Sequence, residues 1–221
     1  NVENLRLLSS ETAKGTGNRL DNTLYAGAGN NVLDGGSGTD TVSYAYATGG
    51  VTVSLARDSA QATGGSRSDT LLRIENLSGS PYHDKLTGSS AANRLDGAAG
   101  NDTLSGGSGN DLLLGGLGND SLGGGSGNDI FRFDTRPSAS SNRDRISDFN
   151  VRDDTLQLEN AVFTSLTRVG TLAQGSLRAG NGFSSAHDVN DYLIYNRTTG
   201  ALYYDADGNG TDAAAVQFAT L

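Results

Sequence analysis

Aspartates recur at a fixed place in four consecutive nine-residue segments of this chain. The segments read GAAGNDTLS (97–105), GGSGNDLLL (106–114), GGLGNDSLG (115–123) and GGSGNDIFR (124–132). Each has a glycine-rich start, an aspartate in sixth place and an apolar residue in eighth place. Calcium is a hard cation that takes six to eight oxygen ligands, which carboxylates and backbone carbonyls supply. Short acidic side chains in one register, 21 Asp against 4 Glu in the whole chain, therefore predict a row of calcium sites.

The same register extends toward the N-terminus and defines the elements that must position these carboxylates. Apolar residues recur every nine residues in two blocks, which residues 43–73 separate. They are Leu24, Leu33 and Val42 in the first block and Leu77, Leu86, Leu95, Leu104, Leu113, Leu122 and Phe131 in the second. A period this short indicates a solenoid rather than a globular core. Burying one such side chain contributes only about 1.5–3 kcal/mol. Ordering the backbone costs roughly 1–2 kcal/mol for each of nine residues, so bound metal must supply part of the stability.

Asparagine replaces aspartate in sixth place at Asn22, Asn31 and Asn93. Two interpretations stay open for these loops. Either they form weak or empty calcium sites, or the asparagines form plain Asx turns without metal.

The pattern G-G-x-G-x-D-x-U-x resembles the calcium-binding nonapeptide of RTX (repeats-in-toxin) proteins. The resemblance implies an all-β fold, a parallel β-roll in which two nonapeptides form one coil and calcium lies between loop n and loop n+2. Asp84 would then face Asp102, Asp102 would face Asp120, and Asp111 would face Asp129. Glycines in first, second and fourth place are expected to allow positive φ.

The resemblance also implies the ligands, which are carbonyls from the first and third residues of a loop and the carboxylate of the sixth. Carried onto this sequence, the set is Asp84; Gly97, Ala99 and Asp102; Gly106, Ser108 and Asp111; Gly115, Leu117 and Asp120; Gly124, Ser126 and Asp129; and Gly35, Ser37 and Asp40. The expected content is about four to eight Ca²⁺ ions.

We expect four segments along the chain. They are a first, degenerate RTX block (1–42), a β-hairpin insertion (43–73), the main β-roll (74–134) and a C-terminal β-rich cap (135–221). Val51, Val53 and Leu55 alternate as a strand does, and paired glycines mark turns on both sides, which predicts a hairpin that leans on the roll. An open solenoid end exposes apolar residues and strand edges, so a cap is required.

A second candidate calcium site lies in the cap. Asp205, Asp207 and Asn209 have the D-x-D-x-N-G spacing that begins an EF-hand loop. The glutamate expected in twelfth place is missing because Val216 stands there, and the flanks look like strands. Two interpretations of this loop stay open, namely a calcium site and a simple hairpin turn.

Composition and missing motifs exclude several classes of function. The chain has no cysteine, so it forms neither disulfides nor thiolate zinc sites. A net charge of −9 argues against nucleic acid and anionic membranes as partners. No apolar run is long enough for a transmembrane segment. Neither H-E-x-x-H nor G-x-S-x-G occurs, and we expect no enzyme activity in this chain.

The resemblance implies the C-terminal region of a secreted bacterial protein, exported by the type I secretion machinery and located outside the cell or at its surface. The expected function is a non-catalytic module that folds when it meets extracellular calcium. Three alternatives stay open. The chain could be a polysaccharide-binding accessory module of an alginate epimerase-like enzyme, a calcium-dependent adhesin or surface-layer anchor, or the tail of a protease or lipase.

Overall fold

The computed structural model describes residues 3–210 and 212–221, and the first two residues of the predicted 1–42 block lie outside this part. The described residues form 21 strands and no helix. This part of the chain accordingly has no helix of the length and apolar character needed to cross a membrane. The expected all-β fold is confirmed.

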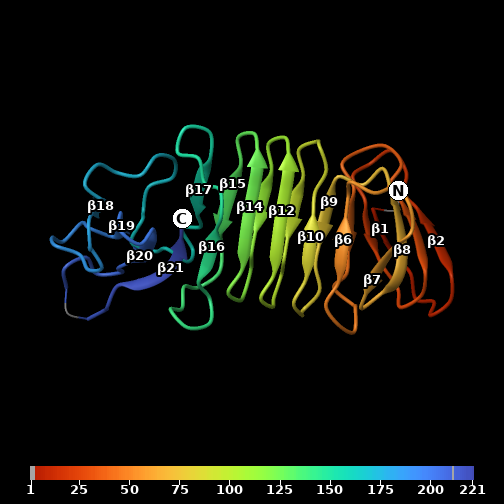
Figure 1. The fold of residues 1–221 in the computed structure, drawn as a ribbon, viewed down its shortest axis with the longest axis horizontal. Coiled ribbons are helices and arrows are strands. Elements are labelled where there is room, and N and C mark those ends of the chain that lie inside the picture. Colours follow the sequence, from red (N-terminus) through yellow and green to blue (C-terminus); the bar gives the residue numbers. More distant parts are fainter. Residues whose placement is uncertain (1–2, 211) are drawn as a thin grey trace.

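One wall of the molecule is a sheet of eight parallel strands (Figure 1). Each strand has three or four residues. In spatial order they are β1 (Asn4–Arg6), β3 (Thr23–Tyr25), β5 (Thr41–Ser43), β9 (Asn76–Ser78), β11 (Arg94–Asp96), β13 (Leu112–Leu114), β15 (Ile130–Phe133) and β17 (Thr155–Leu158).

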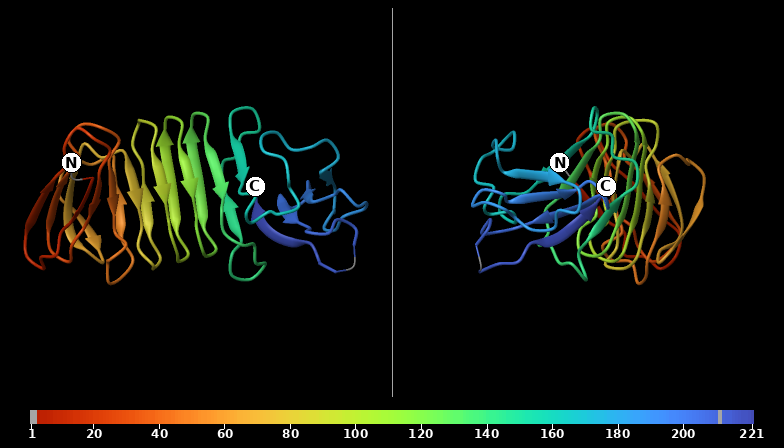
Figure 2. Two further views of the ribbon diagram at one scale, coloured as in Figure 1. Left: turned by 180° about the vertical axis from the view of Figure 1, so that it is seen from behind. Right: turned by 60° about the vertical axis from the view of Figure 1, so that its left-hand side comes forward.

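The facing wall is divided into two sheets. Near the N-terminus four strands pair, namely β2 (Ala13–Thr16), β4 (Asn31–Asp34), β8 (Arg67–Leu72) and β7 (Gln61–Gly64). The rest of this wall belongs to a nine-stranded sheet, whose first five strands are β6 (Thr52–Ser54), β10 (Lys85–Thr87), β12 (Thr103–Ser108), β14 (Ser121–Ser126) and β16 (Asp144–Ile146). The walls face each other along the roll, and a cap covers one end (Figure 2).

Strands pair in parallel with a shift of 18 residues, which confirms two nonapeptides per coil. Leu86 is in register with Leu104 and Leu104 with Leu122 on one wall. Leu95 is in register with Leu113 on the other. The ten apolar residues of the nine-residue register all point inward and are at most 1% exposed, because each fills an equivalent place between the two walls.

Residues 43–73 are more closely integrated than a hairpin leaning on the roll. Strands β7 and β8 do form an antiparallel hairpin. However, β8 also pairs in parallel with β4, and β6 pairs in parallel with β10. Val53 and Leu71 are buried in the core, so this segment supplies wall strands as well as a hairpin.

The roll continues past residue 134, where the cap was expected to begin. β16 pairs in parallel with β14, and β17 pairs in parallel with β15. These two strands form one further coil, so the cap strands start beyond Leu158. They are β18 (Leu177–Gly180), β19 (Leu193–Asn196), β20 (Ala201–Tyr204) and β21 (Val216–Thr220).

The cap shares a sheet and a core with the roll. β21 pairs in parallel with β16, so the nine-stranded sheet runs without a break from roll to cap. Phe218 of β21 lies 5.1 Å from Phe133 and 5.2 Å from Phe163, measured between ring centroids. Phe163 lies in turn 5.0 Å from Tyr204. Edge-on aromatic contacts of this kind add to the area they bury and hold the cap rigidly against the last coil.

Candidate metal centre

The sixth-place residues form two ladders, one along each row of turns. In each ladder a carboxylate oxygen accepts the backbone N–H of the sixth-place residue one coil earlier. The N–H of Asp84 donates to Asp102 Oδ1 at 2.7 Å, and that of Asp102 donates to Asp120 Oδ1 at 2.8 Å. In the other ladder the N–H of Asp111 donates to Asp129 Oδ1 at 2.9 Å. All three predicted pairs are therefore brought together.

In five sixth-place aspartates of the described residues, the second carboxylate oxygen has no partner. In five residues Oδ2 is buried and makes no hydrogen bond within the described part of the chain; they are Asp40, Asp102, Asp111, Asp120 and Asp129. The five residues are at most 1% exposed. A buried carboxylate oxygen without a hydrogen bond or counter-charge is costly, so the arrangement is suited to a cation.

Carbonyl oxygens of the first-place glycines point at the same positions. A Cβ placed on Gly97 would overlap Asp102 Oδ2 and lie 2.5 Å from the carbonyl oxygen of Gly115. A Cβ on Gly106 would overlap Asp111 Oδ2 and lie 2.6 Å from the carbonyl oxygen of Gly124. Gly97 and Gly106 thus each leave a space between their own loop's carboxylate and a carbonyl from the next coil. Gly35 leaves the same space beside Asp40 Oδ2, where the carbonyl comes from Arg73.

Positive φ occurs in second and fourth place but not in first place. Gly116 has φ of 93° and Gly118 has φ of 140°, and the loops of Asp40, Asp111 and Asp129 repeat this pair of glycines. Ala98 adopts φ of 70° in second place, a left-handed conformation that side chains other than Asn and Asp rarely adopt. The expectation of positive φ in first place is wrong. Glycine is required there because a Cβ atom would overlap the neighbouring carboxylate oxygen, and not because the backbone needs a positive φ.

Third-place residues of neighbouring coils stack on each other, and the carbonyls of Leu117 and Ser126 make hydrogen bonds within the roll. Ala99 bridges Leu117, and Ser108 is in register with Ser126. The carbonyl of Leu117 accepts the N–H of Gly100 at 2.8 Å, and that of Ser126 accepts the N–H of Gly109 at 2.9 Å. In the first block, the N–H of Ser37 donates to the carbonyl of Asn18 at 3.0 Å.

Burial raises the pKa of every carboxyl in the ladders for which a shift is resolved. The pKa of Asp102 rises to about 8, chiefly through burial and with a further contribution from the charges of Asp120 and Asp84. Burial and the charge of Asp120 raise the pKa of Asp144 to about 8. Burial raises that of Asp111 to about 6. Without a cation the fold resists ionisation of these groups.

Asp84 and Asn93 differ from the five aspartates with free oxygens. In the loop of Asp84, glycine is replaced by Ser80, whose N–H donates to Asp84 Oδ2 at 2.6 Å and whose Oγ donates to Oδ1 at 2.7 Å. The amide of Asn93 donates from Nδ2 to the carbonyl of Glu75 at 2.8 Å, and its Oδ1 accepts the N–H of Ser89. Both side chains therefore find their partners within the protein.

Three ladder aspartates were not predicted, and Glu75, which holds sixth place before Leu77, was not predicted as a ligand. Asp144 Oδ1 accepts the N–H of Asp120 at 3.1 Å, and Asp154 Oδ1 accepts that of Asp129 at 3.0 Å. Asp69 Oδ1 accepts the N–H of Asn31, and Glu75 Oε2 accepts that of Asp40. The three aspartates keep the motif D-x-U, as in Asp-Arg-Ile, Asp-Thr-Leu and Asp-Thr-Leu. That motif was a usable signal, but the irregular spacing concealed it.

The candidate loop in the cap connects the antiparallel strands β20 and β21. Asp207 Oδ2 accepts the N–H groups of Asp212 and Ala213 at 2.8 and 3.0 Å, as a turn-stabilising carboxylate does. Asp205 is buried, and Asn209 Nδ2 donates to the carbonyl of His187 at 3.1 Å. The three predicted residues thus lie in one hairpin loop, with strands on either side as expected.

The chemistry of the ladders fits a hard divalent cation. The donors are carboxylate and carbonyl oxygens, which Ca²⁺ prefers, and neither a thiolate nor an imidazole is among them. The residues that would hold such ions are the five aspartates with free Oδ2 atoms and the first-place carbonyls of Gly115 and Gly124.

A comparison with known protein families agrees with this chemistry. The family model of the RTX calcium-binding nonapeptide repeat (4 copies) matches residues 16–44, 73–104 and 96–131. No curated protein matches the chain. The solution structure of the AlgE6R3 subunit of the Azotobacter vinelandii mannuronan C5-epimerase is 30% identical and covers 62% of this chain and 68% of that chain, with a TM-score of 0.38. The crystal structure of the extracellular lipase LipA from Serratia marcescens is 16% identical and covers 100% of this chain and 40% of that chain, with a TM-score of 0.28.

Proposed function

Because this chain belongs to the RTX calcium-binding repeat family through residues 16–44 and 73–131, we propose that it is a non-catalytic module that folds on meeting extracellular calcium. By folding there it supports the type I secretion and the folding of a larger secreted protein. Calcium is the partner that triggers folding, and the secretion machinery is the partner during export.

One observation carries this proposal, namely the five buried Oδ2 atoms without a hydrogen bond. They lie between successive coils, and those of Asp40, Asp102 and Asp111 lie beside carbonyl oxygens of the next coil. A cation there would link two coils at once. Without it, stacked carboxylates repel each other and must be protonated or left ionised in a low-dielectric place. The number of free oxygens supports about five calcium sites, within the expected range of about four to eight.

The calcium concentration then decides whether the chain is folded. Extracellular calcium modules bind with dissociation constants of about 10⁻⁴–10⁻³ M. Calcium at about 1 mM stabilises the folded state by about 0.4–1.4 kcal/mol for each site of this affinity. At the tighter end of this range five sites contribute of order 7 kcal/mol, which is comparable to the whole stability of a domain. Submicromolar calcium contributes almost nothing, so the acidic chain stays unfolded until it is outside the cell.

The test is far-UV circular dichroism of the whole chain during a calcium titration that starts from EGTA. We expect a cooperative coil-to-β transition near 10⁻⁴–10⁻³ M calcium, and none with magnesium at the same concentration. Magnesium is the matched control because it demands near-octahedral geometry and loses its waters reluctantly. A chain that is already β-rich in EGTA and that calcium leaves unchanged would refute the folding switch.

The cap loop of Asp205, Asp207 and Asn209 is proposed as a separate, weaker calcium site. Asp207→Asn removes a carboxylate that also holds the turn. We expect it to leave the main folding transition in place and to remove at most one bound ion, counted by equilibrium dialysis. Loss of the main transition would show that the cap loop nucleates the fold instead.

An alternative function, polysaccharide binding, is favoured by the outer face of the β6–β16 wall. Its outward residues are all hydroxylated, cationic or glycine; in strand order they are Thr52, Ser54, Lys85, Thr87, Thr103, Ser105, Ser121, Gly123 and Arg145. In a chain of net charge −9 this face lacks acidic residues at these positions. Titration of the calcium-loaded chain with a polyuronate tests the alternative. A loss of affinity of about threefold or more in Lys85→Gln would support it, and no binding would refute it.

A further inference from the structure

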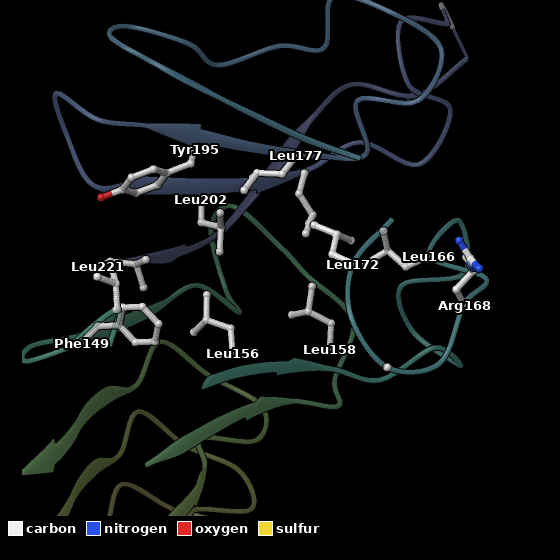
Figure 3. A pocket seen from close by; sticks show the side chains of 13 residues that line it. Phe149, Leu156, Leu158, Leu166, Arg168, Leu172, Leu177, Tyr195, Leu202 and Leu221 are labelled. Carbon is white, nitrogen blue, oxygen red and sulfur yellow. The ribbon is translucent and has the colours of Figure 1, made fainter. Parts of the chain in front are cut away.

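The row of inward side chains along the eight-stranded wall ends in a cavity. Leu95, Leu113 and Phe131 follow each other in register and are fully buried. The next residue in register is Leu156 of β17, which is only partly buried, as is Leu158. Because β17 is the last strand of its sheet, no further coil covers them. Both line a cavity of about 460 Å³ between the roll and the cap (Figure 3).

The other side of the cavity is also apolar. Leu177 of β18, Leu193 of β19 and Leu202 of β20 line it from the cap. Leu193 and Leu202 are buried, whereas Leu177 is 48% exposed, so the cavity opens to solvent beside Leu177. Pockets that hold small molecules have volumes of about 300–1,000 Å³ and predominantly apolar walls with few polar groups. This cavity meets both criteria.

One cation stands at the end of the cavity. Arg168 is the only charged side chain among the 13 described residues that line it. Figure 3 shows Arg168 at one end and Tyr195 at the other. None of the three salt bridges found among the described residues includes Arg168. This arginine has no acidic partner among the described residues in a chain of net charge −9, and it complements an anionic group at its end of the apolar space.

We propose that this cavity binds a medium-chain fatty acid. The alkyl tail lies among the leucines, and the carboxylate pairs with the Arg168 guanidinium, whose planar fork matches a carboxylate. At the roughly 30 Å³ that one water molecule occupies, the cavity has room for about 15 heavy atoms, which accommodates decanoate. This site is independent of the calcium ladders and goes beyond the proposed calcium function.

The test is isothermal titration calorimetry of the whole calcium-loaded chain with decanoate and octanoate, at concentrations where their calcium salts stay dissolved. Burial of one methylene changes affinity about fourfold, so decanoate should bind about fifteenfold more tightly than octanoate. Arg168→Gln should weaken decanoate binding about three- to tenfold. Arg197→Gln is the matched control, because Arg197 is exposed on a cap turn and does not line the cavity.

A further variant separates binding from folding. Leu177→Asp places a charge at the exposed rim, and we expect loss of decanoate binding with an unchanged calcium midpoint in circular dichroism. Three results would overturn the proposal. They are no heat of binding at millimolar decanoate, equal affinities for octanoate and decanoate, or equal binding by Arg168→Gln and the parent chain. A dimer in light scattering that covers the face and excludes decanoate would overturn it too.

Discussion

Replacing Asp102 with asparagine should change stability in opposite directions with and without calcium. Asp102 stands in the middle of its ladder, where Oδ1 accepts the N–H of Asp84 and Oδ2 is buried without a partner. Asparagine keeps the acceptor. Its amide also places an N–H donor beside the carbonyl of Gly115.

Without calcium the substitution should stabilise the fold. The pKa of Asp102 is raised to about 8, above its ordinary value of 3.8. For a raised carboxyl pKa, the stability that this group contributes is full below 3.8 and is lost as the pH rises through about 8. At pH 8 the parent chain has therefore lost nearly all of this contribution to the free energy of unfolding. Because solvent screens the charge, the loss amounts to about 1–3 kcal/mol. Asparagine carries no charge, so the variant avoids this loss.

With calcium the substitution should destabilise the fold. Asp102 would contribute to the sites on both sides of its coil, facing Asp84 and Asp120. Loss of two sites that each contribute about 1.4–2.7 kcal/mol at about 10 mM calcium removes about 3–5 kcal/mol, which exceeds the gain of about 1–3 kcal/mol from asparagine. The sign of the effect therefore reverses between the two conditions.

The assay is urea unfolding at pH 8, followed by far-UV circular dichroism, in EGTA and in about 10 mM calcium. If the metal-free chain is unfolded, trimethylamine N-oxide brings it into a measurable range. Asp58→Asn is the control, because Asp58 is exposed and outside the ladders, and it should change neither condition. Equal destabilisation of Asp102→Asn in EGTA and in calcium would refute the reasoning.

Three further predictions concern the same ladders. Gly106→Ala should weaken calcium binding at least tenfold in the calcium titration, because the methyl group would lie 2.6 Å from the carbonyl oxygen of Gly124. Gly49→Ala is the control, because its methyl group would meet no atom within 4 Å and should leave calcium binding unchanged. Asp144→Asn should raise the calcium midpoint severalfold, although Asp144 lies outside the repeats. Asp153→Asn is the control, because Asp153 is exposed and the midpoint should not change. Equal midpoints for Asp144→Asn and the parent chain would exclude Asp144 as a ligand. Lowering the pH from 8 to 5 should raise the melting temperature in EGTA, because burial raises ladder pKa values to about 6 and about 8. The same change should lower the melting temperature in calcium, because protons compete with the metal, and a fall in both conditions would contradict this.

The sequence was sufficient to predict the walls of the roll and the pairing of the ladders. Leu86, Leu104 and Leu122 fall in register because every coil repeats the same environment, so a position in the repeat determines a position in space. The same equivalence brings Asp102 beside Asp120. In a solenoid of this kind, long-range contacts are set by the period.

The sequence did not predict the ladder and strand partners that lie outside the nine-residue period. Asp144 and Asp154 follow their ladder partners by 24 and 25 residues rather than 18, because the intervening turns are longer. β6 pairs with β10 and β8 with β4, and a strand of three residues has too little pattern of its own to indicate such a partner. The space beside Gly97 depends on a carbonyl from the next coil, which the local sequence does not contain.

The ladders of N–H groups and carboxylates give the roll a direction. In every step except that from Glu75 to Asn93, a carboxylate on the C-terminal side accepts an N–H on the N-terminal side, and Asp144 and Asp154 are the final acceptors. A coil that joins at the N-terminal edge meets acceptors already held in place, whereas one that joins at the opposite edge must bring its own. We therefore expect coils to add one after another at the N-terminal edge of the roll. Shortening the roll from its N-terminal edge leaves each remaining step complete, while removing β16 and β17 deprives both ladders of their last acceptors.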